Sequence, residues 1–161
     1  MRLTTRTNLA LRTLMFCAVN RDRTVRKHEI ALACNASENH LAQVINALSQ
    51  YGFVRTIRGR TGGMKLARDA KGITAGEVFR AFESNLPFAE CFDKQNNTCP
   101  LSSACILREA ISAALDAFYG ALDNFTLADL VENNAGLARL LSLDRLGVDC
   151  KIVQKRHLSA I

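Results

Sequence analysis

The chain has 161 residues, of which 48% are apolar and 22% charged, as in an ordinary globular protein. No apolar run approaches the roughly 18–20 residues of a membrane span, so the composition excludes a membrane-spanning protein. The formal net charge of +6 is unevenly spread: residues 1–70 carry 12 Lys/Arg against 4 Asp/Glu, whereas residues 71–161 carry 9 against 11. The excess predicts that the first 70 residues face a polyanion such as nucleic acid.

The first fifty residues predict three helices. Apolar periodicity indicates a helix over Thr7–Asn20, with Leu11, Leu14, Met15 and Ala18 inward, and a short one from about Arg26 to Cys34. Ser37 is a good N-cap for a third helix that runs to about Tyr51. Two helices joined by a short turn are typical of a helix-turn-helix, whose second helix enters a major groove. The predicted outer face of the third helix carries hydrogen-bonding side chains: Asn39, His40, Gln43, Asn46 and Gln50.

A predicted hairpin follows the third helix. The residues of 53–57 and 64–66 alternate like two strands, and Arg58–Gly63 joins them. Arg58 and Arg60 are expected to reach phosphates or a narrow minor groove, where the glycines allow close approach. The predicted fold is therefore mainly α with a small β-wing, a winged helix-turn-helix with a long dimerisation helix. The residues expected to contact DNA are Arg12, Lys27, His28, Ser37, Glu38, Asn39, His40, Gln43, Arg58, Arg60, Gly62 and Gly63.

The sequence of the second half of the chain predicts three helices, one of them long enough to extend from the rest as an arm. Thr74–Glu77 reads as a capping box opening a helix to about Glu83, and Thr126 as the cap of a short helix over 127–132. Between them a long helix over 104–124 carries an apolar stripe that its own chain is too small to cover, which favours pairing with a second copy over packing within one chain. The predicted division is 1–84 for DNA binding, 85–143 for the cysteine loop and dimerisation helix, and 144–161 as a tail.

Three thiols occupy one short loop, as Cys91, Cys99 and Cys105. We expect a cytoplasmic protein with reduced thiols, so a disulfide framework fits poorly. A structural zinc site usually has a Cys-x₂-Cys knuckle and four ligands, and this spacing has neither. An iron–sulfur cluster tolerates wider spacing because each thiolate binds a different iron. Spacing favours the cluster and leaves zinc, or a cofactor-free thiol-based redox sensor, as alternatives.

The remaining chemistry-bearing residues predict no catalysis. Cys17 and Cys34 lie in predicted helices and Cys150 in the tail, and we assign these three no role. The chain has no nucleotide-binding glycine loop, and its histidines lack metal-site spacing. An enzyme is therefore not predicted.

Several motifs together resemble one family of regulators. They are Met1–Thr4, Arg58–Gly63, Glu90–Phe92, Thr98–Leu101 with Cys105 after it, and Leu122–Val131. In combination they resemble the winged-helix iron–sulfur repressors that include NsrR, IscR and RirA. The resemblance implies a homodimer that reads a palindromic double-stranded operator. It also implies that the three loop cysteines hold a 4Fe–4S cluster, or a 2Fe–2S one.

Within that family two signals compete. Ser37–Leu41 with Val44–Asn46 is similar to the recognition helix of NsrR, which implies a repressor released by nitric oxide. Some NsrR proteins have an aspartate at position 8 as fourth cluster ligand from the partner subunit. This chain has Asn8 there, whose neutral carboxamide is a weaker iron ligand. Asn8 with Thr7, and Cys17–Asn20, are instead similar to RirA, which implies an iron-responsive regulator.

Overall fold

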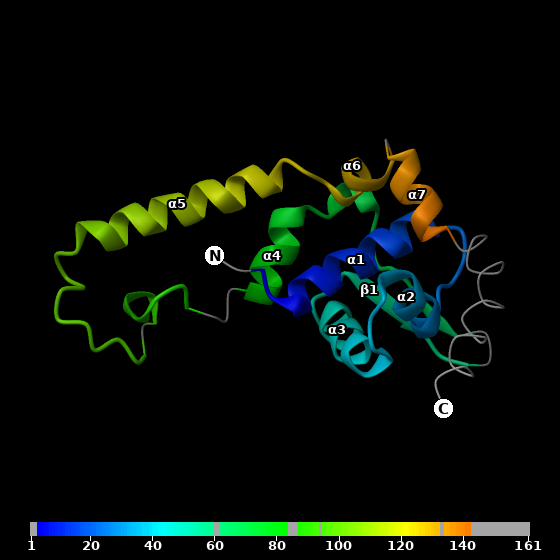
Figure 1. The fold of residues 1–161 in the computed structure, drawn as a ribbon, viewed down its shortest axis with the longest axis horizontal. Helices are drawn as coiled ribbons and strands as arrows, with labels where there is room; N and C mark the ends of the chain where they lie inside the picture. The colour runs from blue at the N-terminus through cyan, green and yellow to red at the C-terminus, as the bar shows by residue number, and fades with distance from the viewer. Residues whose placement is uncertain (1–2, 60–61, 84–86, 94, 133, 143–161) are drawn as a thin grey trace, which may run out of the picture.

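The computed structural model describes residues 3–59, 62–83, 87–93, 95–132 and 134–142. Within these ranges the elements are α1 (Thr5–Val19), α2 (Lys27–Cys34), α3 (Glu38–Gln50), β1 (Val54–Ile57), β2 (Gly63–Leu66), η1 (Ala70–Gly72), α4 (Ala75–Glu83), η2 (Glu90–Phe92), α5 (Ile106–Asp123), α6 (Leu127–Val131) and α7 (Ala135–Leu141). Figure 1 shows a head built from α1–α4, the hairpin, α6 and α7, from which α5 extends as an arm. The predicted fold class is confirmed, and the predicted tail lies outside the described ranges.

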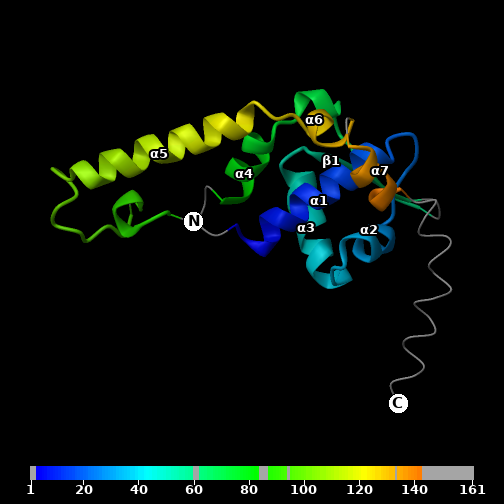
Figure 2. The ribbon, with the colours of Figure 1, turned by 45° about the horizontal axis from the view of Figure 1, so that its top comes forward.

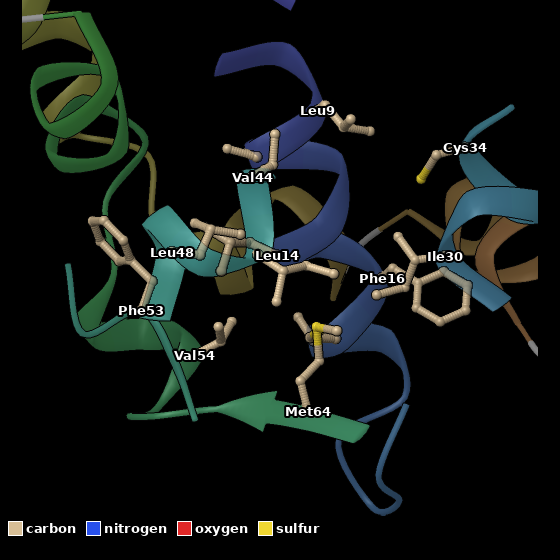
Figure 3. Packing of buried hydrophobic residues seen from close by; sticks show 14 of the residues in the cluster. Leu9, Leu14, Phe16, Ile30, Cys34, Val44, Leu48, Phe53, Val54 and Met64 are labelled. Atoms are coloured by element: carbon tan, nitrogen blue, oxygen red, sulfur yellow. The ribbon is translucent and has the colours of Figure 1, made fainter. Parts of the chain in front are cut away.

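The core of the head surrounds α1. Thr4 caps this helix, because its side chain accepts a hydrogen bond from the Thr7 amide. Leu14 and Phe16 are fully buried, and Figure 3 shows Phe16 beside Ile30 of α2. The single apolar stripe predicted for α1 is incomplete, since other faces of the helix are buried too. The reason is that α1 contacts α2, α3, α4, β2, α6 and α7, so it is enclosed on several sides.

The helix-turn-helix forms as its sequence predicts. Asn35 ends α2 in the left-handed region at φ 49°, which Asn tolerates better than most residues. Ser37 then caps α3 by accepting from the His40 amide at 3.2 Å. The apolar side chains of α3 pack against the head, and Figure 3 shows Val44 and Leu48 facing α1. The opposite side of α3 is left exposed.

The hairpin is a two-stranded antiparallel sheet. Its register runs from Val54 opposite Leu66 to Ile57 opposite Gly63. Val25 extends it with a short bridge to Met64, with N···O distances of 3.0 and 2.8 Å. The hairpin therefore lies in a fixed position beside α1 and α3, as the predicted wing requires.

The arm joins the head near one end of α5. Thr74, before α4, pairs with Thr126, after α5, in an isolated bridge. None of the side chains of α5 is fully buried, and its main neighbour is α4. Beyond α6, the short helix α7 was not predicted. The side-chain amide of Asn20 holds the end of α7 by donating to the Leu141 carbonyl at 3.0 Å. In the described part of the chain, no helix has the length and apolar character needed to cross a membrane.

Candidate functional site

The outer face of α3 is the first part of the candidate site. Asn39, Gln43, Asn46 and Gln50 are exposed and His40 is half-buried. Leu41, Val44 and Leu48 on the other face are fully buried, so packing fixes which side of the helix points outward. The exposed amide side chains carry donors and acceptors suited to base edges in a major groove. The structure thus presents a row of hydrogen-bonding side chains on the outer face of α3.

Other predicted DNA contacts hold the turn in place. The Lys27 ammonium pairs with the Glu38 carboxylate at 3.1 Å, which ties the start of α2 to the start of α3. The Arg12 guanidinium donates to the Cys34 carbonyl at 3.3 Å, and His28 is exposed on α2. Lys27 and Arg12 therefore position the helix-turn-helix, and their outer atoms still lie at its surface.

The wing tip shows why its glycines are needed. Gly59 has φ 112°, a backbone conformation that side chains disfavour. A Cβ added at Gly62 would lie 2.5 Å from the Ile57 carbonyl oxygen, and one at Gly63 would lie 2.3 Å from that of Val25. Gly62 and Gly63 are thus required by the hairpin itself. Arg58 is exposed beside the tip, and Arg60 lies outside the described residues.

The cysteine loop connects the head to the free end of the arm. Cys91 lies in η2, Cys99 in the irregular segment that follows, and Cys105 is the N-cap residue of α5. All three are free thiols and half-buried. Across the described ranges, no three His, Cys, Asp or Glu side chains are gathered as ligands of a metal ion would be. The fold brings the trio to one loop without gathering all three thiols around a single-ion site in the described ranges.

Two contacts that the sequence analysis missed hold this loop. The Glu90 carboxylate accepts hydrogen bonds from the side chain and amide of Thr98, which lower the pKa of Glu90. Arg108 donates to the Cys91 carbonyl at 3.1 Å and lies over the Phe92 ring. Arg108 follows Cys105 by three residues, and this spacing places it on the same helix face. This spacing was the sequence signal that could have predicted the contact of Arg108 with the loop.

The two buried cysteines differ from the loop trio. Burial, with the nearby Cys34, raises the pKa of the Cys17 thiol to about 12. Burial also raises the pKa of Cys34, against the opposing charge of Arg12. Both therefore remain protonated thiols at neutral pH and behave as apolar core residues.

A tight joint connects α4 to the arm. Arg80 donates to both carboxylate oxygens of Asp123, at 2.7 and 2.5 Å, and the Thr74 hydroxyl donates to the same carboxylate. A Cβ added at Gly76 would lie 2.1 Å from Asp123 Oδ1, so only glycine allows this approach. Phe79 packs edge-on against Phe118, with ring centroids 5.8 Å apart. These contacts fix the angle between α4 and α5.

A second joint ties α4 to the start of α1. The Glu83 carboxylate accepts hydrogen bonds from the Thr4 amide, the Thr4 hydroxyl and the Thr7 hydroxyl. Partial burial would raise the pKa of Glu83, but these hydrogen bonds lower it, and the net shift is downward. Asn8 is half-buried one residue after Thr7. The end of α4, which precedes the cysteine loop, is therefore bonded to the helix at the centre of the head.

Comparison with known proteins identifies the family. The family model described as Rrf2, an iron-dependent transcriptional regulator, matches residues 3–133. The chain belongs to the Rrf2 family. It is 43% identical over 142 residues to the HTH-type transcriptional regulator NsrR of Geobacillus kaustophilus, a match that covers 88% of this chain and 97% of that protein. Rrf2 proteins are transcriptional regulators, so the prediction that this protein is not an enzyme is confirmed.

Solved structures agree with this assignment. IscR of T. potens has a TM-score of 0.63 at 25% identity, covering 81% of this chain and 85% of that one. CymR, the global cysteine regulator of Bacillus subtilis, has a TM-score of 0.65 at 27% identity, covering 82% and 97%. The chain is thus a DNA-binding regulator with the winged-helix fold of its family.

Proposed function

We propose that this Rrf2 regulator is a repressor that reads a palindromic operator in the cytoplasm through α3 and the wing. The exposed row on α3, with Asn39 and Gln43 near its start, supplies base-reading groups, and Arg58 supplies charge beside them. The excess of Lys/Arg over Asp/Glu in residues 1–70 also supports DNA binding by this part of the chain. Gln43 would read bases and Arg58 would contact the phosphate backbone.

The operator-bound form is proposed to be a homodimer built along α5. Among the described residues, Leu107 on the predicted stripe is 67% exposed. A groove of about 1100 Å³ runs between α4, α5 and the cysteine loop, lined in part by Phe79, Phe88, Ile111 and Leu115. A second copy of the arm would cover this apolar surface, and two heads related by a two-fold axis would match a palindrome.

Cys91, Cys99 and Cys105 are proposed to hold a 4Fe–4S cluster. The single observation that carries this proposal is the placement of three free, half-buried thiols on one loop that ends at α5. Three thiolates are a fitting donor set for such a cluster, with one iron left for a ligand from elsewhere. When bound, the cluster would supply irons that react with nitric oxide.

The two joints of α4 are proposed to link the loop to the head. Arg80 and Asp123 fix α5 against α4, and Glu83 fixes α4 against α1. A change in the loop would therefore alter how the two heads are held in the dimer. We propose the same division of labour as the sequence predicts: residues 1–84 bind DNA, and residues 85–143 carry the cluster and the dimer contact.

Nitric oxide is the proposed signal, supported by the NsrR-like recognition helix and by the similarity to NsrR of Geobacillus kaustophilus. A second candidate is iron availability. Two observations favour it: the description of the family as iron-dependent, and Asn8 in place of a carboxylate. An iron left without a strong fourth ligand would be lost more readily.

Anaerobic titration tests these proposals. Oxygen-free protein is expected to contain iron and sulfide and to shift an operator fragment. Nitric oxide is then added to one sample and an iron chelator to another, and operator binding is followed in both. Release of the operator at stoichiometric nitric oxide, with binding retained in the chelator, supports nitric oxide as the signal. Release by the chelator, with binding retained in nitric oxide, supports iron availability.

A set of cysteine variants tests the cluster ligands. Cys91→Ala, Cys99→Ala and Cys105→Ala should each lose the cluster, whereas Cys150→Ala should retain it. Colourless protein that holds zinc, or operator binding without any metal, would refute the cluster.

A further inference from the structure

A second cavity lies on the head, away from the cysteine loop. It has a volume of about 700 Å³ and lies between the C-terminal end of α1, the outer face of the hairpin, η1 and the α6–α7 segment. Six basic side chains line it against three acidic ones. The basic residues are Arg21, Arg23, Arg55, Lys65, Arg68 and Lys71.

Two of these six cations are paired with a carboxylate in the part of the chain that the structure describes. Arg23 pairs with Glu29, and Arg68 pairs with Glu77. Arg21, Arg55, Lys65 and Lys71 form no ion pair with any carboxylate of the described residues. The carboxylate of Asp69, which also lines the cavity, caps the backbone amide of Lys71 instead. Against these six cations, the three lining carboxylates, with Glu29 and Glu77 from outside the cavity, leave an excess of one positive charge among the described residues.

The hairpin register adds a second, independent observation. Arg55 and Lys65 stand directly opposite each other in the antiparallel pair, so both side chains extend from the same face. Like charges at directly opposed positions destabilise a sheet. This face would be more stable with an anion between the two cations.

The position of the cavity argues against DNA as the occupant. Figures 1 and 2 show α6 and α7 on the opposite side of α1 from α2 and α3. Val131, Glu132 and Ala138 from that opposite side form one wall of the cavity. A duplex seated on α3 does not face this wall. A volume of this size is in the range of small-molecule sites, roughly 300–1,000 Å³.

We propose that this cavity binds a small organic polyanion, bearing either phosphate or several carboxylates, among Arg55 and Lys65 of the hairpin and Arg21 and Lys71, which line the same cavity. The inference is independent of the iron–sulfur cluster. Such a ligand would neutralise the opposed pair and bond the base of the wing to the end of α1.

Calorimetric titration of the full-length protein tests this site. Fructose 1,6-bisphosphate is the phosphate probe and tricarballylate the carboxylate probe. One of them is expected to bind with one site per chain and to raise the unfolding temperature, and the arm that binds identifies the anion class. Arg55→Gln and Lys65→Gln should each weaken binding at least tenfold. The matched control is Arg139→Gln on α7, an exposed arginine outside the cavity, which should bind as the wild type does.

Two results would overturn the proposal. The first is that neither probe binds; if Arg55→Gln and Lys65→Gln then also lower the affinity for random-sequence DNA at least tenfold more than the control does, this surface is a DNA-backbone contact. The second is that Arg139→Gln weakens binding as much as Arg55→Gln, which would indicate attraction by net charge alone. Because both hairpin variants remove like-charge repulsion, their unfolding temperatures without ligand should not fall, so lost binding cannot be ascribed to misfolding.

Discussion

Replacing Gly76 by alanine should loosen the joint between α4 and the arm. The new Cβ would lie 2.1 Å from Asp123 Oδ1 and 2.9 Å from the Tyr119 carbonyl oxygen. The Asp123 carboxylate is held by Arg80 and the carbonyl belongs to helix backbone, so neither can give way without opening the interface. Overpacking of this kind costs about 1–3 kcal/mol, whereas alanine gains up to about 1 kcal/mol in helix propensity over glycine. We expect a net loss of about 1–2 kcal/mol in the free energy of unfolding.

Gly136→Ala is the matched control. Gly136 in α7 and Gly76 in α4 are each the second residue of their helix, and each follows an alanine. Its added Cβ would lie 3.5 Å from Asn134 Oδ1, an ordinary contact, so this variant should be as stable as the wild type or up to about 1 kcal/mol more stable. Urea unfolding of the three proteins, with comparison of midpoints and m-values, measures the difference.

A double variant locates the cause. Asp123→Ala removes the nearer of the two clashing groups, so Gly76→Ala should cost less in that background than in the wild type. Equal stability of Gly76→Ala and Gly136→Ala in the wild-type background would refute the close approach of α4 and α5 on which this prediction rests.

Three further predictions concern the head. Ser37→Ala removes the cap of α3 and should lower the free energy of unfolding by about 1 kcal/mol, measured by urea unfolding, with Ser103→Ala as a control outside any helix cap. Gln43→Ala should reduce discrimination between operator and random DNA, whereas Arg58→Ala should weaken binding to both and flatten the salt dependence; titrations at several salt concentrations separate the two, and identical profiles would contradict the division. Glu83→Gln should destabilise the protein by about 1 kcal/mol near neutral pH. Because the pKa of Glu83 is lowered from its ordinary value of 4.5, its contribution is present above that value and is lost as the pH falls through the folded pKa. The stability gap between wild type and Glu83→Gln should therefore shrink below pH 4.5, and a gap that stayed constant in acid would exclude the ionised carboxylate as its source.

Local signals in the sequence predicted the helix-turn-helix well. The cap at Ser37 and the apolar period of α3 are properties of adjacent residues, and the structure has this helix within one residue of the predicted bounds. The burial of α1 was predicted less well. A single stripe assumes one neighbour, whereas α1 is packed on several sides, and that arrangement depends on elements up to about 120 residues away in the chain.

Other features depend on long-range contacts that no local pattern specifies. The capping box predicted at Thr74 forms only in half: Thr74 accepts from the Glu77 amide, but the Glu77 carboxylate pairs with Arg68. Helix α7 is short and weakly patterned, and its tie to Asn20 spans 121 positions. The spacing of the three loop cysteines sets the largest distance that can separate their thiols, but it does not determine whether the thiols come together at one site. Their convergence depends on the loop conformation.

The attachment of α5 near one end gives it the mechanics of a lever. Asp123 lies at the fixed end and Cys105 caps the other, so at 1.5 Å per residue the two ends are about 27 Å apart. A rotation of about 5° at the Asp123 end therefore displaces the Cys105 end by about 2 Å. Conversely, a shift of one sulfur by about 2 Å corresponds to only about 5° of tilt at the head. Small angular play at Gly76 would be enough to absorb such a movement, which is why the tightness of that contact matters for signalling as well as for folding.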